Sequence, residues 1–472
     1  MEGIEVVSVD FSAQNTTLWN VIIQFGIMAG ATLFANLLRR KVPFIKNSLM
    51  PTAVLAGFLL LLLGSTGLLR MDTAFMEKVT YHGIAIGFIA MSLRIPPKAS
   101  NETGAGLTAV KSGALIVSTY LMQALVGFII VLALAYTVMP NLFKAAGILL
   151  PMGYGQGPGQ ANNVGTTYEA LGFAGGRSFA LAIAAAGYLC ACIVGVVYLN
   201  LLNKKGKLKK QTPEDLSGSV SVDAFQDKGE IPVSESIDKF SMQVALVIIV
   251  YLATYLVTWG ITSGLAAVSP GLANSVSSIL WGFNFIIGSA LAMLVRVVLQ
   301  KLRATNIMTR QYQNNYLLNR ISGVAFDMMI IAGIASIDIG DLTGLWVPFL
   351  LMAVAGGVST LLYLQWLCKV LYPNYYYEGF VSMYGMMTGT ISSGVLLLRE
   401  IDQNFETPAA NNLVTGSSTG ILFGIPMLIF IGMAPKSDAM LYITIGAVAV
   451  YLVLLVLFML KFKGKAGRNA GK

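Results

Sequence analysis

Two glycine-rich segments bring together the residue types that bind small ions. The first segment is YGQGPGQANN at 154–163, and the second is YGMMTGTISS at 384–393. Side-chain amides and hydroxyls offer both donors and acceptors, and glycine lets a bound ion approach the backbone closely. Backbone carbonyls suit Na⁺, whereas helix N-termini suit a carboxylate.

The two segments also match each other along the chain at a constant offset. The matched pairs are Tyr154 with Tyr384, Gly155 with Gly385, Gly159 with Gly389, and Asn162 and Asn163 with Ser392 and Ser393. Both surrounding stretches, 145–173 and 378–405, are apolar enough to enter a membrane but too rich in Gly, Pro and polar residues for ordinary helices. They are therefore predicted to be re-entrant loops, since irregular backbone at membrane depth must face protein or a water-filled cavity.

The composition requires a membrane around these segments. Hydrophobic residues make up 56% of the 472 residues, charged residues 11%, and the mean hydropathy is +0.72. A soluble domain carries about 25% charged residues. The net charge of +9 falls mainly in short loops between apolar segments, which indicates membrane topology rather than a nucleic-acid partner.

Eleven apolar segments are long enough to be transmembrane helices of an all-α polytopic protein. They lie at 19–37, 50–69, 81–97, 112–138, 178–202, 241–268, 276–299, 321–338, 342–370, 410–435 and 438–461. With the N-terminus outside, the inner side holds all of the 31 Lys and Arg residues except Arg70, Lys78, Lys144, Arg177 and Lys436. This asymmetry predicts an inner (plasma) membrane protein with a cytoplasmic C-terminus.

The spans divide into two five-helix repeats of opposite orientation, each with one re-entrant loop. The repeats cover 1–202 and 241–435, the polar stretch 203–240 is a cytoplasmic linker, and 436–472 adds one helix and a basic tail. Inverted repeats with broken, glycine-rich segments are typical of secondary transporters. The tips of the two loops are expected to meet near the middle of the membrane.

The candidate ligands come from both loops and from one acid within a span. Asp327 lies in SGVAFDMMIIAGIA, where an acid is costly and so indicates function, here a Na⁺ site. The predicted sodium ligands are Tyr154, Gly155, Thr166, Asp327, Tyr384, Gly385 and Gly389. The predicted substrate-binding residues are Gly157, Gly159, Gln160, Asn162, Asn163, Thr388, Thr390, Ser392, Ser393 and Arg399.

At these residues the chain resembles the bacterial sodium/glutamate symporter family. The resemblance also rests on NSLMPTAVLAGFLL at 47–60 and NRISGVAFDMMIIAGIASIDIGDL at 319–342. It implies a probable homodimer of inverted five-helix repeats that carries glutamate with Na⁺ and needs no other cofactor. The family's first loop has a Gly-Gly-His-Gly core, whereas 153–157 holds no histidine here, so another carboxylate or H⁺ coupling stays open.

Two other classes of function are weighed against a carrier. An ion channel usually exposes a ring of charges or carbonyls, and an inverted repeat with polar tips fits a carrier better. For an enzyme, Gly416–Gly420 matches G-x-S-x-G, but it opens an apolar span, and the chain's single histidine, His82, is expected at a different depth. No nucleophile–base pair can be assembled, so the chain is not expected to be an enzyme.

Overall fold

A computed structural model shows an all-helical protein over the part of the chain that it describes. That part comprises residues 11–43, 45, 50–69, 71–95, 105–205, 236–268, 277, 280–282, 284–308, 310–402 and 407–461. Most of the predicted linker at 203–240 and the tail after Lys461 lie outside the described residues.

The described part of the chain forms a series of helices. In chain order they are α1 (Thr16–Lys41), α3 (Thr52–Ser65), α4 (Thr73–Leu93), α5 (Ala105–Ala135), η1 (Lys144–Ile148), α6 (Leu149–Tyr154), α7 (Pro158–Ala170), α8 (Gly176–Lys204), α9 (Ser236–Val268), α11 (Asn284–Ala304), α12 (Asn315–Ala335), η5 (Gly340–Leu342), α13 (Trp346–Leu371), η6 (Pro373–Tyr375), α14 (Tyr376–Thr388), α15 (Ile391–Arg399), α16 (Ala409–Met433) and α17 (Asp438–Lys461).

Eight of these helices are long and apolar enough to cross a membrane: α1, α5, α8, α9, α11, α12, α13 and α17. The chain is thus a multi-pass membrane protein. The other three predicted spans also form helices. α16 bends by 44° and raises the number of candidates to nine, α3 has only 14 residues, and α4 carries Glu77 and Lys78 in its first half. The crossing number of eleven stays a prediction.

Side-chain caps fix the starts of the two helices that will form one wall of the candidate site. The Asp72 carboxylate accepts a hydrogen bond from the Phe75 backbone N–H at 3.0 Å at the start of α4. The Asn314 amide oxygen accepts one from the Leu317 N–H at 2.8 Å at the start of α12. Each cap satisfies one of the N–H groups that the first turn of a helix leaves free.

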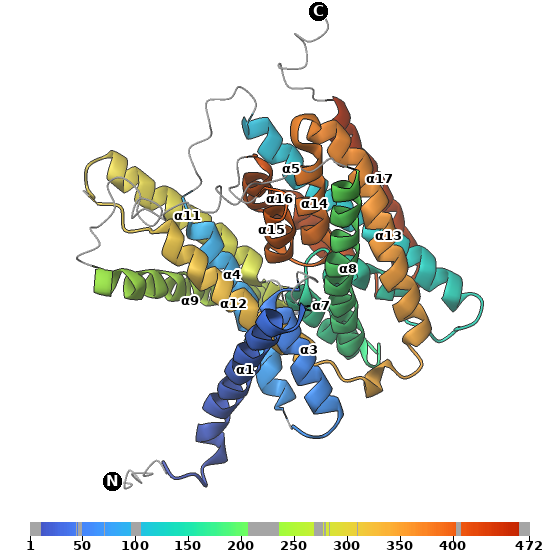
Figure 1. The fold of residues 1–472 in the computed structure, drawn as a ribbon, viewed down its shortest axis with the longest axis horizontal. Helices are drawn as coiled ribbons and strands as arrows, with labels where there is room; N and C mark the ends of the chain where they lie inside the picture. Colours follow the sequence, from blue (N-terminus) through green and yellow to red (C-terminus); the bar gives the residue numbers. More distant parts are fainter. Residues whose placement is uncertain are drawn as a thin grey trace, which may run out of the picture.

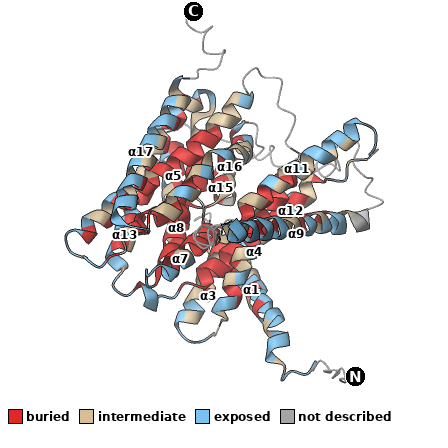
Figure 2. Ribbon diagram, turned by 180° about the vertical axis from the view of Figure 1, so that it is seen from behind, coloured by how far each residue is buried: buried red, intermediate tan, exposed pale blue. Residues whose placement is uncertain are grey.

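The helices form two bundles that lie side by side (Figure 1). Bundle one is built from α1, α3, α4, α9, α11 and α12, and bundle two is built from α5 to α8 and α13 to α17. Each bundle therefore takes helices from both halves of the chain. The core lies mainly in bundle two, around α5, α7 and α8, whereas α9 exposes most of its length (Figure 2).

The two halves repeat the same order of elements and the same packing. Numbered from its start, each half has three helices, a long helix, a broken pair and a fifth long helix. α1 packs on α3 as α9 packs on α11, and α3 packs on α12 as α11 packs on α4. Likewise, α5 packs on α16 as α13 packs on α8. This exchange of partners is what two copies related by a two-fold axis would produce.

The two glycine-rich segments are more helical than the sequence suggests. Instead of irregular loops, each is a pair of helices separated by a short break: residues 155–157 between α6 and α7, and 389–390 between α14 and α15. Gly157 has φ +81°, and Pro158, which has no N–H, begins α7. Helical pairing satisfies the backbone on both sides of a break, so only two or three residues leave the regular pattern.

Candidate functional site

The two breaks touch each other at the centre of the molecule. A Cβ atom placed on Gly157 would lie 3.4 Å from Thr390 Cγ2 and 3.6 Å from the Gly389 carbonyl oxygen. A positive φ and this close approach both favour glycine at position 157. The structure thus brings the tips of the two segments together, as expected from the repeat.

A partly open cavity lies beside the breaks, between the two bundles. Four of the predicted residues line it: Gly155, Gln160, Gly389 and Thr390. Its walls come from α4, α11 and α12 of bundle one and from α5, α7, α14, α15 and α16 of bundle two. A space between two packed bodies is where transporters hold their cargo.

Gln160 is the most telling side chain of this cavity. It lies in the first turn of α7, is only 1% exposed, and neither its Nε2 nor its Oε1 has a hydrogen-bond partner among the described residues. An unpaired buried amide costs roughly 1–3 kcal/mol. Such a cost is understandable where a ligand completes the hydrogen bonds.

The neighbouring amides of α7 have other surroundings. The Asn163 Nδ2 donates to the Gly282 carbonyl oxygen of bundle one at 2.5 Å, and Asn162 is buried without lining the cavity. Gly159 lets α7 approach bundle one, since a Cβ atom there would lie 2.5 Å from Ile84 Cδ1 and 2.9 Å from Met329 Sδ. Asn163 and Gly159 thus fix α7 against bundle one rather than facing the cavity.

In the second segment, the hydroxyls divide in the same way. The Thr388 hydroxyl donates to the Tyr384 carbonyl oxygen at 2.7 Å and is fully buried, so it belongs to the helix. Ser393 lies behind Gly389, where its Oγ would be 2.8 Å from an added Cβ atom. The backbones of Ser392 and Arg399 belong to α15, but their side chains lie outside the described residues.

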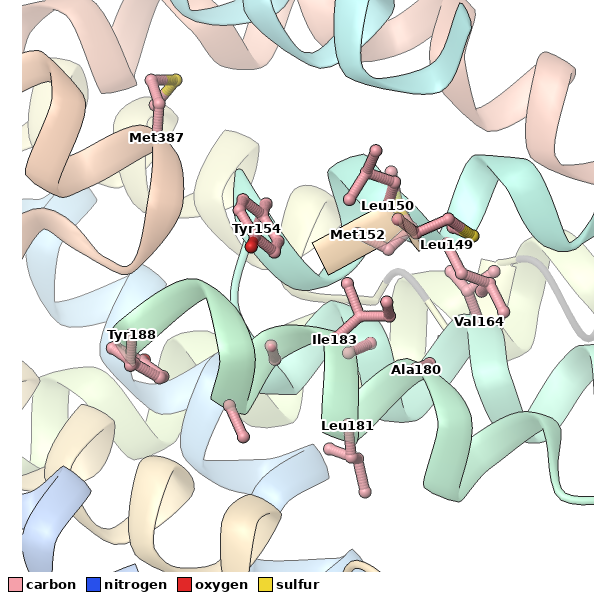
Figure 3. Close-up of a cluster of buried hydrophobic side chains, with 14 of the residues drawn as sticks. Leu149, Leu150, Met152, Tyr154, Val164, Ala180, Leu181, Ile183, Tyr188 and Met387 are labelled. Carbon is pink, nitrogen blue, oxygen red and sulfur yellow. The ribbon is translucent and has the colours of Figure 1, made fainter. Parts of the chain in front are cut away.

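Several of the predicted sodium ligands serve packing. The Tyr154 hydroxyl donates to the Ala353 carbonyl oxygen, and its ring lies in a cluster of buried apolar side chains (Figure 3). Tyr384 is 1% exposed, and Gly385 packs on Gly394. Gly155 accommodates the Tyr120 ring, from which an added Cβ atom would be only 2.3 Å away.

The remaining two predicted sodium ligands lie on helices that border the cavity but do not line it. Asp327 and Thr166 are both exposed, on α12 and α7, and neither lines the cavity. The structure therefore does not gather the seven predicted sodium ligands at one point. A helix places successive residues in different directions, so Phe326 and Met329 face the cavity while Asp327 does not.

Sequence reasoning missed three polar lining residues: Tyr120, Gln156 and Ser417. Tyr120 lies in an ordinary apolar span, and its local sequence gives no indication that it lines a cavity. Ser417 belongs to the G-x-S-x-G match, yet its hydroxyl donates to the Leu413 carbonyl oxygen at 2.6 Å. His82 lies 2.7 Å from the Tyr251 hydroxyl, within bundle one. Gly416 and Gly420 of the G-x-S-x-G match allow α16 to pack closely on α5.

A second group of polar residues joins the bundles away from the cavity. The Arg177 Nε pairs with the Glu77 Oε1 at 3.1 Å, and its Nη2 donates to the Ser336 carbonyl oxygen at 3.3 Å. Next to it, the Ser178 hydroxyl donates to the Asp341 Oδ2 at 2.7 Å. We call Glu77, Arg177, Ser178 and Ser336 the interface clasp. It ties α8 of bundle two to α4 and α12 of bundle one.

Comparisons with known proteins leave the family open. No protein-family model matches the chain, and a search of curated proteins finds no match.

Proposed function

We propose that this chain is a secondary active transporter that carries a small carboxylate anion through a membrane together with Na⁺. The observation that carries the proposal is Gln160, whose amide is buried without partners in a cavity between two bundles, next to the point where two broken segments meet. The resemblance to the sodium/glutamate symporter family makes glutamate the first cargo to test.

The geometry of the breaks suits both ions. α7 and α15 begin at the breaks, and neither N-terminus has a side-chain cap, so first-turn N–H groups are free to meet a carboxylate. The carbonyl of Gly389 and the hydroxyl of Thr390 are oxygen donors of the kind that Na⁺ accepts. Asp327 then acts as a nearby balancing charge rather than as a ligand in the cavity.

Transport in this proposal is a movement of one bundle against the other. Both broken segments belong to bundle two, which would carry the cargo past bundle one as alternating access requires. The proposal includes eleven spans, inverted halves, re-entrant broken segments, an outside N-terminus, a cytoplasmic C-terminus, the bacterial inner membrane and assembly as a homodimer. It includes neither an enzymatic activity nor a nucleic-acid partner.

The test is uptake of labelled glutamate by proteoliposomes that contain the purified full chain. We expect uptake against a concentration gradient when Na⁺ is higher outside, and none when K⁺ replaces Na⁺ or when an ionophore removes the gradient. Uptake that is driven by a proton gradient instead would show that the coupling ion is H⁺ rather than Na⁺. A steady conductance without accumulation would show a channel and contradict the proposal.

A further inference from the structure

The cavity has most of its polar lining where it meets the breaks. There Gln156, Gln160 and Thr390 line it together with two glycines of the breaks. Of the other polar lining residues, Tyr120 packs on Gly155 and the Ser417 hydroxyl donates to the Leu413 carbonyl oxygen. Most of the other lining side chains are aliphatic or aromatic, and none of the described lining side chains is charged. A ligand in this cavity therefore meets hydrogen-bonding groups at one end and apolar groups along its body.

An aromatic wall forms the apolar end. The ring of Phe88 lies 5.1 Å from that of Phe285 and 5.5 Å from that of Phe326, and all three line the cavity. Phe88 is one helical turn beyond Ile84, the residue on α4 that touches Gly159. The wall thus begins one turn away from the break, about the length of a short side chain.

These surroundings can hold one carboxylate but not two. The first is met by the free N–H groups at the start of α15 and by the Gln160 amide, whose Nε2 lacks a partner. A second carboxylate would lie against the aromatic wall without a cation or a sufficient set of donors. A buried charge without a partner is far more costly than a buried alkyl group.

We infer that the cavity selects a monocarboxylate with an aliphatic or aromatic body over a dicarboxylate of the same shape. This inference rests on the proposed transport function and narrows its cargo. It places the specificity in Phe88, Phe285 and Phe326 and leaves the anchoring of the common carboxylate to Gln160 and α15.

Two matched pairs of probes test the inference. Homoleucine is glutamate with the distal carboxylate replaced by an isopropyl group, and 5-methylhexanoate is glutarate with the same replacement. Binding to the purified full chain is measured by thermal stabilisation in Na⁺, and transport by competition with labelled homoleucine in proteoliposomes. We expect the apolar member of each pair to bind and compete at least tenfold better.

The outcomes separate the inference from the proposed function. Na⁺-driven uptake of glutamate that equals or exceeds that of homoleucine would overturn the inference and leave the carrier standing. Failure of all four probes both to bind and to be taken up would overturn both. Phe285→Ala should lower the affinity for homoleucine and reduce its advantage over glutamate. Phe75→Ala, a buried aromatic of the same bundle outside the cavity, should leave the ratio unchanged.

Discussion

The two broken segments occupy corresponding places in the two halves, yet their surroundings differ. α7 packs against α4 and α12 of bundle one, and Asn163 adds a hydrogen bond to that bundle. α14 and α15 have their main contacts within bundle two, with α8, α13 and α16. The cavity lies on the side of α15 that faces α4 and α12. The two halves therefore have the same order of helices, but their broken segments make different contacts.

This difference shows where movement has room. Under the correspondence of α4 with α12 and of α7 with α15, the space beside α15 is the counterpart of the packed contact of α7. A movement that closes the first and opens the second would exchange the surroundings of the two segments. The asymmetry is therefore expected to mark one of two states of a carrier rather than a fixed inequality.

The largest effect is expected from locking the packed side. We predict that a disulfide between Gly159→Cys on α7 and Ile84→Cys on α4 abolishes transport, because it joins the bundles. A Cβ atom on Gly159 lies 3.0 Å from Ile84 Cβ, so only a small shift reaches the usual 3.5–4.5 Å of a disulfide. Uptake is measured before and after a reductant, in a background without Cys190, Cys192 and Cys368.

The control disulfide lies within bundle one. Gly57→Cys and Ile334→Cys have a similar separation of 2.8 Å, join α3 to α12 of the same bundle and do not line the cavity. Transport should survive this disulfide. If oxidised protein with the Gly159–Ile84 link transports as well as the reduced form, transport needs no movement of one bundle against the other. The unequal contacts of α7 and α15 would then not mark one of two transport states.

A somewhat smaller loss of transport is expected when the amide of Gln160 is removed. Among its described residues, the second broken segment places no amide in the cavity. We predict that Gln160→Leu reduces uptake by roughly 10- to 100-fold, since a hydrogen bond to a charged group contributes about 1.5–3 kcal/mol. The melting temperature should stay constant or rise, because the substitution removes unpaired polar atoms. Uptake rates and thermal unfolding of the purified protein check both parts.

Gln123 provides the matched control for Gln160. It is equally buried, but its Nε2 donates to Thr360 Oγ1 at 2.8 Å and to the Met387 carbonyl oxygen at 2.9 Å. Gln123→Leu should therefore lower the melting temperature. A fall of the same size for Gln160→Leu would show that Gln160 has a structural role.

The interface clasp should contribute to stability more than to binding. We predict that Glu77→Gln lowers the melting temperature by a few degrees, because it leaves the buried Arg177 without its ion pair. The neighbouring exposed Lys78→Gln should change it little. Thermal unfolding is the measurement, and an unchanged value for Glu77→Gln would mean that the clasp holds nothing together.

The smallest effect concerns the caps of the two corresponding helices. The hydrogen bond from the Phe75 N–H, and then that from Asn20, lowers the pKa of the Asp72 carboxyl. This cap therefore contributes fully above the unfolded pKa of about 3.9 and is lost as pH falls through the lower folded value. Asn314 does not titrate. We predict that Asp72→Asn removes this dependence below about pH 4, with a change of at most about 1 kcal/mol.

Composition and pattern predicted the class of fold and the position of the helices well. Hydrophobic length located eight helices that are long and apolar enough to span a membrane, since burial in lipid imposes this length on any sequence. The repeat also led to the expectation that the tips of the two glycine-rich segments meet, and Gly157 does lie against Thr390. Around their breaks the two segments are more helical than expected, because glycine and polar residues that discourage an isolated helix are accepted in one that is packed on all sides.

The candidate site was only partly predictable, because the sequence gives the type of each side chain but not the direction in which it points. Gln160 and Asn163 have similar side chains three residues apart, yet one faces the cavity and the other faces Gly282. Asp327 drew attention as an acid within an apolar span, whereas its apolar neighbour Phe326 lines the cavity. Tyr120 shows the converse, since nothing in its local sequence sets it apart from other aromatic residues of the spans.

The short helix α3 has a consequence for the lipid around the protein. Its 14 residues span only about 21 Å, against roughly 30 Å for the hydrocarbon core of a bilayer. Leu62 is 61% exposed and offers lipid an apolar contact close to the end of the helix. The bilayer beside α3 is thus expected to thin, which makes acyl-chain length a variable that acts on bundle one from outside.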